Sequence, residues 1–78
     1  MTVGENIKRI RKQKRLTQKQ LGELCNPSIS AATIRKYELN ILNPKLETLQ
    51  KISTALDVSI TDLNDDLDML LSRSLKYY

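Results

Sequence analysis

Residues 17–38 read TQKQLGELCNPSISAATIRKYE, and they predict two short helices joined by a tight turn. Thr17 opens the first helix and Gln20 follows three residues later, which is the capping-box pattern in which each side chain bonds the other residue's backbone N–H. Asn26-Pro27-Ser28 ends this helix, because proline disfavours helical geometry in the residue before it and Asn and Ser favour turns. Ser30 is suited to cap the second helix.

On either side of this stretch, apolar residues recur at helical spacing and no alternating β-branched run is present. The spacing predicts an all-α fold with helices over residues 4–14, 17–25, 30–39, 45–56 and 60–71. Residues 1–63 are expected to form one domain, and residues 64–78 a helical C-terminal extension. The closely spaced second and third helices have the sequence form of a helix-turn-helix.

The residue inventory limits the chemistry that the chain can perform. Its 78 residues contain no His and one Cys, which excludes a disulfide within the chain, a Cys/His zinc site and any histidine-based catalysis. Cys25 stands at a helical apolar position and is expected to be a small core residue. We therefore expect no catalytic residues, no metal and no cofactor, and the chain is not expected to be an enzyme.

Charge is distributed unevenly along the sequence. Residues 1–45 hold ten Lys and Arg against three acidic residues, a net charge of +7, whereas residues 46–78 hold three against six, a net charge of −3. The first part is the candidate polyanion-binding face, and the alternative is that these are ordinary solvated helix faces. No apolar run is long enough for a membrane span and the N-terminus lacks a signal peptide's apolar core, so a cytoplasmic chain is expected.

Four ordered motifs resemble the phage repressor/Cro-like (Xre-type) helix-turn-helix family. They are Ile7-x-x-Ile10-Arg11, Leu16-Thr17-Gln18-x-x-Leu21, Ser30-x-x-Thr33-Ile34-x-x-Tyr37-Glu38, and the stretch from Asn43 to Val58 that reads NPKLETLQKISTALDV. The resemblance covers roughly residues 4 to 63. It implies a compact five-helix lambda-repressor-like DNA-binding domain in which the helix after Ser30 enters the major groove and the helix after Thr17 lies across the DNA backbone.

The resemblance also assigns side chains to DNA. It implies phosphate contacts from Thr17, Gln18, Lys19, Ser30 and Lys45, and base contacts from Ala31, Ala32, Thr33, Arg35 and Lys36. An alanine methyl can pack against the C5-methyl of thymine, while Arg and Lys can donate to guanine N7 and O6. The alternative for the two alanines is that they are only good helix formers on a solvated first turn.

Two positions in the family pattern, Arg11 and Glu38, commonly pair with each other. We favour this pair over a phosphate contact by Arg11, since a Glu beside DNA needs a cationic neighbour. Arg15 and Asn40 stand where glycine is usual, and both are expected to adopt left-handed geometry.

The turn before the third helix is two residues longer than the common family pattern. The third helix therefore begins either at Ser30 or earlier, with Asn26 as its cap and Pro27 in its first turn.

The C-terminal part carries an apolar stripe in the acidic half of the chain. Leu63, Leu67, Leu70 and Leu71 are the candidate dimer interface, and the equally weighted alternative is that the stripe covers the core of the monomer. The expected function is a sequence-specific double-stranded DNA-binding transcriptional regulator, a repressor acting as a homodimer on a palindromic operator. The alternatives are a controller or antitoxin-type regulator, or a protein-binding helical module, whose protein partner binds the C-terminal helix.

Overall fold

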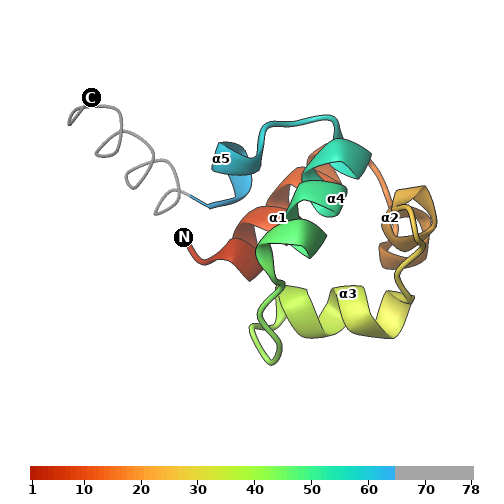
Figure 1. The fold of residues 1–78 in the computed structure, drawn as a ribbon, viewed down its shortest axis with the longest axis horizontal. Helices are drawn as coiled ribbons and strands as arrows, with labels where there is room; N and C mark the ends of the chain where they lie inside the picture. The colour runs from red at the N-terminus through yellow and green to blue at the C-terminus, as the bar shows by residue number, and fades with distance from the viewer. Residues whose placement is uncertain (65–78) are drawn as a thin grey trace.

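Five helices and no strand make up residues 1–64, the part of the chain that the computed structural model describes. The helices are α1 (Val3–Gln13), α2 (Gln18–Leu24), α3 (Ala31–Glu38), α4 (Leu46–Leu56) and α5 (Ile60–Leu63). α3 runs along the lower edge of the domain in Figure 1, with α2 near its N-terminal end and α1 and α4 above it. The all-α prediction is confirmed, and within residues 1–64 no helix has the length and apolar content needed to cross a membrane.

All five helices contribute to one hydrophobic core, which the helical spacing of their apolar residues makes continuous. Each helix places at least one side chain there, and Cys25 joins them from the end of α2. The buried apolar residues are Ile7, Ile10, Leu21, Cys25, Ile34, Tyr37, Leu49, Ile52, Leu56 and Leu63.

Hydroxyl side chains fix where three of the helices begin. In α1, α2 and α3 the N-cap hydroxyl accepts the backbone N–H three residues later, at 3.0 to 3.2 Å; the caps are Thr2, Thr17 and Ser30. α3 therefore starts at Ala31, and not at the earlier start near Asn26 that the long turn left open. In α5 the backbone N–H of Ser59 donates to Asp62 Oδ2 at 3.0 Å.

Three non-glycine residues in left-handed geometry end α1, α3 and α4. They are Arg15 (φ 59°), Asn40 (φ 60°) and Asp57 (φ 57°). After each, the next backbone N–H bonds to the carbonyl five residues earlier at 3.0 to 3.1 Å, the bond that defines a Schellman helix end. The sequence predicted this geometry at Arg15 and Asn40, and Asp57 is an addition.

The two glycines mark close approaches of the backbone that position α3. A Cβ on Gly22 of α2 would collide with the carbonyl of Ile29. The backbone N–H of Ile29 in turn donates to the Gly22 carbonyl at 2.9 Å. A Cβ on Gly4 would collide with the carbonyl of Tyr37 near the end of α3. These contacts hold the turn before α3 against α2 and the end of α3 against α1.

α5 ends at an interruption that the sequence did not predict. We expected a helix over residues 60–71, but Leu63 is the last helical residue and Asn64 has an extended backbone (φ −139°, ψ 95°). The rest of that expected helix and of the expected 64–78 extension lies outside the described residues. The Leu63 carbonyl instead accepts a buried hydrogen bond from Asn6 Nδ2 of α1, at 3.0 Å. Asn6 therefore ties the end of α5 to α1.

Leu63 belongs to the core of the single domain, which corrects its assignment to the dimer interface. Its side chain is fully buried within one chain, so it has no surface to offer a partner. This packing agrees with the alternative in which the apolar stripe covers the monomer's core. Leu67, Leu70 and Leu71, the rest of that candidate interface, lie outside the described residues.

Candidate DNA interface

The outward side of α3 carries three of the predicted base-contacting residues. Ala32, Arg35 and Lys36 are all exposed and lie on one face, because residues three and four apart are neighbours on a helix. The opposite face is buried and consists of Ile34, Tyr37 and Glu38. Ala31 and Thr33 are half-buried and flank the exposed face on its two sides.

The hydroxyl of Thr33 is held in a defined orientation by the cap of α3. Ser30 Oγ accepts the Thr33 backbone N–H at 3.2 Å and donates its own hydrogen to Thr33 Oγ1 at 2.9 Å. Thr33 Oγ1 therefore still has its own hydrogen to donate, whereas Ser30 must release Thr33 Oγ1 before its hydroxyl can donate to a phosphate.

The start of α2 is a complete capping box. Thr17 Oγ1 accepts the Gln20 backbone N–H at 3.0 Å, and the Thr17 N–H donates to Gln20 Oε1 at 2.9 Å. Lys19, the next predicted phosphate contact, is exposed. Gln18, another predicted phosphate contact, is half-buried. Its side chain bonds within the domain, because its Nε2 donates to Glu38 Oε1 at 3.2 Å.

A surface hollow of about 520 Å³ brings residues of α2 and α3 together. Lys19 of α2, Ser30 and Ala31 line it, together with Glu23, Ser28 and Ile29. Two of the predicted phosphate contacts and one predicted base contact thus share one hollow although they lie up to twelve positions apart in the sequence. Glu23 is the acidic residue of this hollow and would oppose an anion there.

Lys45 lies beyond the other end of α3, after the α3–α4 loop. It is the exposed N-cap residue of α4. Its exposed ammonium can therefore reach a phosphate group.

Behind α3, Arg11 and Glu38 form a buried ion pair. Arg11 Nε and Nη2 donate to the two carboxylate oxygens of Glu38, at 2.6 and 3.0 Å, and Arg11 Nη1 donates to the Leu16 carbonyl at 2.7 Å. The side chains are 11% and 2% exposed. The structure thus contains the favoured pair, and Arg11 is turned inward instead of toward a phosphate.

This ion pair and its hydrogen bond to Gln18 join α1, α2 and α3. Arg11 comes from α1, Glu38 from α3, and Gln18 of α2 donates to the same carboxylate. Two-point pairing of a guanidinium with a carboxylate fixes orientation as well as distance. The exposed face of α3 is consequently held at a fixed angle to α1 and α2.

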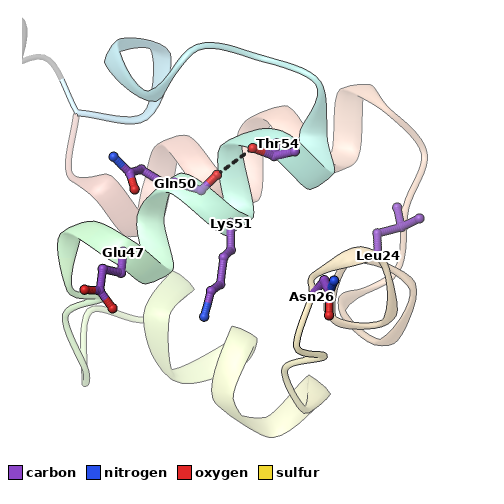
Figure 2. A pocket seen from close by; sticks show the side chains of 6 residues that line it. All are labelled: Leu24, Asn26, Glu47, Gln50, Lys51 and Thr54. Atoms are coloured by element: carbon purple, nitrogen blue, oxygen red, sulfur yellow. Dashed lines mark hydrogen bonds between the residues drawn. The ribbon is translucent and has the colours of Figure 1, made fainter.

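A second hollow, of about 410 Å³, lies between α4 and the end of α2. Leu24 and Asn26 line it from the α2 side, and Glu47, Gln50, Lys51 and Thr54 line it from α4 (Figure 2). Thr54 Oγ1 donates to the Gln50 carbonyl at 2.9 Å. Lys51 is half-buried and also lines a neighbouring hollow beside Thr33. Sequence patterns gave no signal for Lys51, because they treat it as an ordinary helix-surface lysine.

Cys25, at the end of α2, is buried and its thiol donates to the Leu21 carbonyl at 3.4 Å. Burial raises the pKa of the Cys25 thiol, and the nearby Lys51 ammonium offsets part of that rise. A protonated, buried thiol is a poor nucleophile. Cys25 thus acts as a core residue, as the sequence predicted.

The helix-turn-helix family profile matches residues 7–63, nearly all of the domain described above. The chain belongs to this helix-turn-helix family. It is 34% identical over 77 residues to the immunity repressor protein of Bacillus phage phi105, covering 99% of this chain and 52% of that protein. It is 43% identical over 57 residues to the uncharacterized HTH-type transcriptional regulator YqaE of Bacillus subtilis (strain 168), covering 73% of this chain and 47% of that one.

Among solved structures, the domain is similar to the P22 c2 repressor protein, which was crystallised in complex with a synthetic operator. The TM-score is 0.73 with 30% sequence identity, over 81% of this chain and 92% of that one. The resemblance to phage repressors that the motifs indicated is thereby confirmed. The chain spans about half the length of the two curated relatives.

Proposed function

We propose that this helix-turn-helix domain binds double-stranded DNA sequence-specifically and represses transcription by occupying an operator. The observation that carries the proposal is the exposed face of α3, where Arg35 and Lys36 stand beside Ala32 while the opposite face is anchored in the core. The excess of cations in residues 1–45 supports it. So do the relatives, since one is a phage immunity repressor and one is seen with an operator.

In the proposed complex, α3 lies in the major groove and its side chains contact different bases. Arg35 or Lys36 donates to guanine N7 and O6, and the methyl groups of Ala31 and Ala32 pack against thymine methyls. Thr33 donates its free hydroxyl hydrogen to an acceptor on a base edge. One good contact with a guanine contributes about 1–3 kcal/mol of discrimination.

Phosphate contacts would hold α3 in register on the duplex. Thr17, Gln18, Lys19, Ser30 and Lys45 are the proposed contacts. Gln18 has to supply its backbone N–H or its second amide hydrogen, because Glu38 holds the first. Each neutralised phosphate lowers the slope of log affinity against log salt concentration by about 0.9.

A single domain of this size covers only roughly 600–1,000 Å² on DNA, which gives limited affinity. We therefore propose a homodimer on a palindromic operator whose half-sites are about 34 Å apart, one turn of the double helix. The alternative, a regulator or module that mainly binds a protein partner, predicts no enrichment of DNA sequences.

The test is selection of bound duplexes from random DNA, followed by affinity measurements on the selected sequence across salt concentrations. Lys36→Ala is expected to weaken binding to the selected site by about 1–3 kcal/mol, roughly five- to 150-fold, and to relax the preference at one base pair. Lys8→Ala removes the same charge from an exposed position on α1 and is the matched control. Absence of any enriched sequence would refute sequence-specific reading by α3, and equal losses for Lys36→Ala and Lys8→Ala would remove Lys36 from the proposed base contacts.

A further inference from the structure

A surface hollow of about 280 Å³ lies where α4 meets α3 and the turn before it. We call it the hydroxyl hollow, because five hydroxyl side chains line it together with Lys51. They are Ser28 and Ser30 of the turn, Thr33 and Tyr37 of α3, and Thr48 of α4. Tyr37, Thr48 and Lys51 take no part in the proposed contacts with DNA, so the proposed function leaves their arrangement unexplained.

The hydroxyl of Tyr37 is a polar group on an otherwise buried side chain. Tyr37 is 9% exposed and belongs to the hydrophobic core, yet its hydroxyl forms no hydrogen bond with another described residue. Every fully buried side-chain N or O atom in residues 1–64 has a hydrogen-bond partner, so this oxygen must reach solvent. The hydroxyl hollow is a surface that Tyr37 lines. The hydroxyl therefore opens into the hollow with its hydrogen available.

Lys51 brings a positive charge to the same place. Its side chain is half-buried and extends from α4 toward α3, whereas Glu47, four residues earlier, points in another direction (Figure 2). The Lys51 ammonium forms no hydrogen bond or ion pair with another residue of the described range 1–64. The hydroxyl of Thr48, three residues earlier on α4, likewise has no partner among those residues. Three hydrogen-bond donors without a protein acceptor thus meet at one hollow.

The lining of the hydroxyl hollow determines the charge of the ligand that it suits. None of the described residues that line it is acidic, whereas the two hollows described above contain Glu23 and Glu47. Hydroxyl groups and an ammonium can all donate hydrogen bonds, and lysine binds phosphate as a point charge. A phosphate group offers the acceptor oxygens and the negative charge that complement these donors.

We propose that the hydroxyl hollow binds a phosphate group through Lys51 Nζ and the hydroxyls of Tyr37 and Thr48. Two sources can supply the group, a small phosphorylated molecule and the DNA backbone. Tyr37 belongs to the buried face of α3, opposite the exposed face that is proposed to lie in the major groove. This placement favours the small free molecule, and the inference therefore does not depend on the proposed function.

The first test titrates the protein with inorganic phosphate in the absence of DNA, with sodium chloride holding the ionic strength constant. Backbone amide NMR spectra are expected to show saturable shifts at Tyr37, Thr48 and Lys51. Lys51→Met and Tyr37→Phe retain most of the apolar part of each side chain, and each is expected to weaken phosphate binding about tenfold, since hydrogen bonds to charged groups are strong. Lys8→Met removes the same charge from an exposed position on α1 and is expected to bind phosphate like the unmodified protein.

The second test distinguishes the two sources of the phosphate group. The slope of log DNA affinity against log salt concentration is measured on the selected duplex for the unmodified protein, Lys51→Met and Lys8→Met. An unchanged slope, with phosphate binding in the first test, identifies a small free ligand. A slope that is smaller by about 0.9 in Lys51→Met alone identifies a DNA phosphate.

Two results would overturn the proposal. One is the absence of saturable phosphate binding together with an unchanged slope, and the other is phosphate binding that both Lys51→Met and Tyr37→Phe leave intact. Failure to select any duplex would count against the proposed function alone, because the first test contains no DNA.

Discussion

Removing Arg11 is expected to destabilise the domain far more than removing any exposed cation. In Arg11→Met the Glu38 carboxylate loses its two guanidinium hydrogen bonds, of 2.6 and 3.0 Å, while its side chain remains 2% exposed. The Leu16 carbonyl loses its bond as well. Breaking a buried pair by removing one partner costs about 3–5 kcal/mol, because an uncompensated charge stays behind.

That loss is large against the roughly 5–15 kcal/mol by which small domains are stable. Each kcal/mol lowers the melting temperature of a domain of 60–100 residues by about 4–8 °C, so a fall of at least roughly 12 °C is expected. Thermal and urea unfolding followed by circular dichroism at 222 nm measure it. Lys12→Met, which removes one exposed cation from the same helix, is the matched control and is expected to change stability by less than about 0.5 kcal/mol.

The double variant Arg11→Met/Glu38→Leu separates the charge from the loss of packing. Replacing both partners by apolar residues leaves no buried charge, so it is expected to be more stable than Arg11→Met alone. The reasoning is refuted if Arg11→Met and Lys12→Met unfold at the same urea concentration, or if the double variant is the least stable of the three.

Three further predictions concern α3, the turn before it and the core thiol. Ala32→Glu places a carboxylate on the reading face and is expected to weaken DNA binding at least tenfold, about 1.4 kcal/mol, in a titration with the selected duplex; unchanged affinity would remove Ala32 from that face. Gly22→Ala forces its Cβ against the Ile29 carbonyl and is expected to lower the urea midpoint, despite the better helix propensity of alanine; a raised midpoint would contradict the close approach. Burial raises the pKa of Cys25 from 9.0, so above that pH the unfolded chain releases a proton that the native state retains. The free energy of unfolding is therefore unaffected by this thiol below about pH 9 and declines as the pH rises further. Unfolding measured from pH 8 to pH 10 is expected to show this decline in the unmodified protein and to show less of it in Cys25→Ala.

Features set by neighbouring residues were predictable from the sequence. Thr17 and Ser30 were predicted as caps and lie at the starts of α2 and α3, since a cap needs only a hydroxyl and a free N–H three residues on. Asn40 was predicted to be left-handed for a similarly local reason. The Arg11–Glu38 pair spans 27 positions, and the family resemblance, not the spacing, indicated it.

Features that depend on distant contacts were missed. The bond from Gln18 to Glu38 and the bond from Asn6 to the Leu63 carbonyl join residues 20 and 57 positions apart. Asn6 did carry a signal, because it lies beside Ile7 on the inward side of α1, where a polar residue needs a buried partner. The end of α5 at Leu63 gave none, since the apolar period continues past Asn64. The exposure of Leu46 was also missed, because it fits the apolar spacing of α4 although its side chain is 54% exposed.

The two-sided construction of α3 has a consequence for how such a domain can diverge. Ile34, Tyr37 and Glu38 fasten the helix from within, while the side chains of Arg35 and Lys36 share no hydrogen bond with any other described residue. Substitutions at the outward positions can therefore accumulate without loss of folding, so that a duplicated copy could acquire a new target while its scaffold stays the same. The same separation makes α3 suited to redesign, in which its outward residues are replaced by those of another protein while its buried residues are kept.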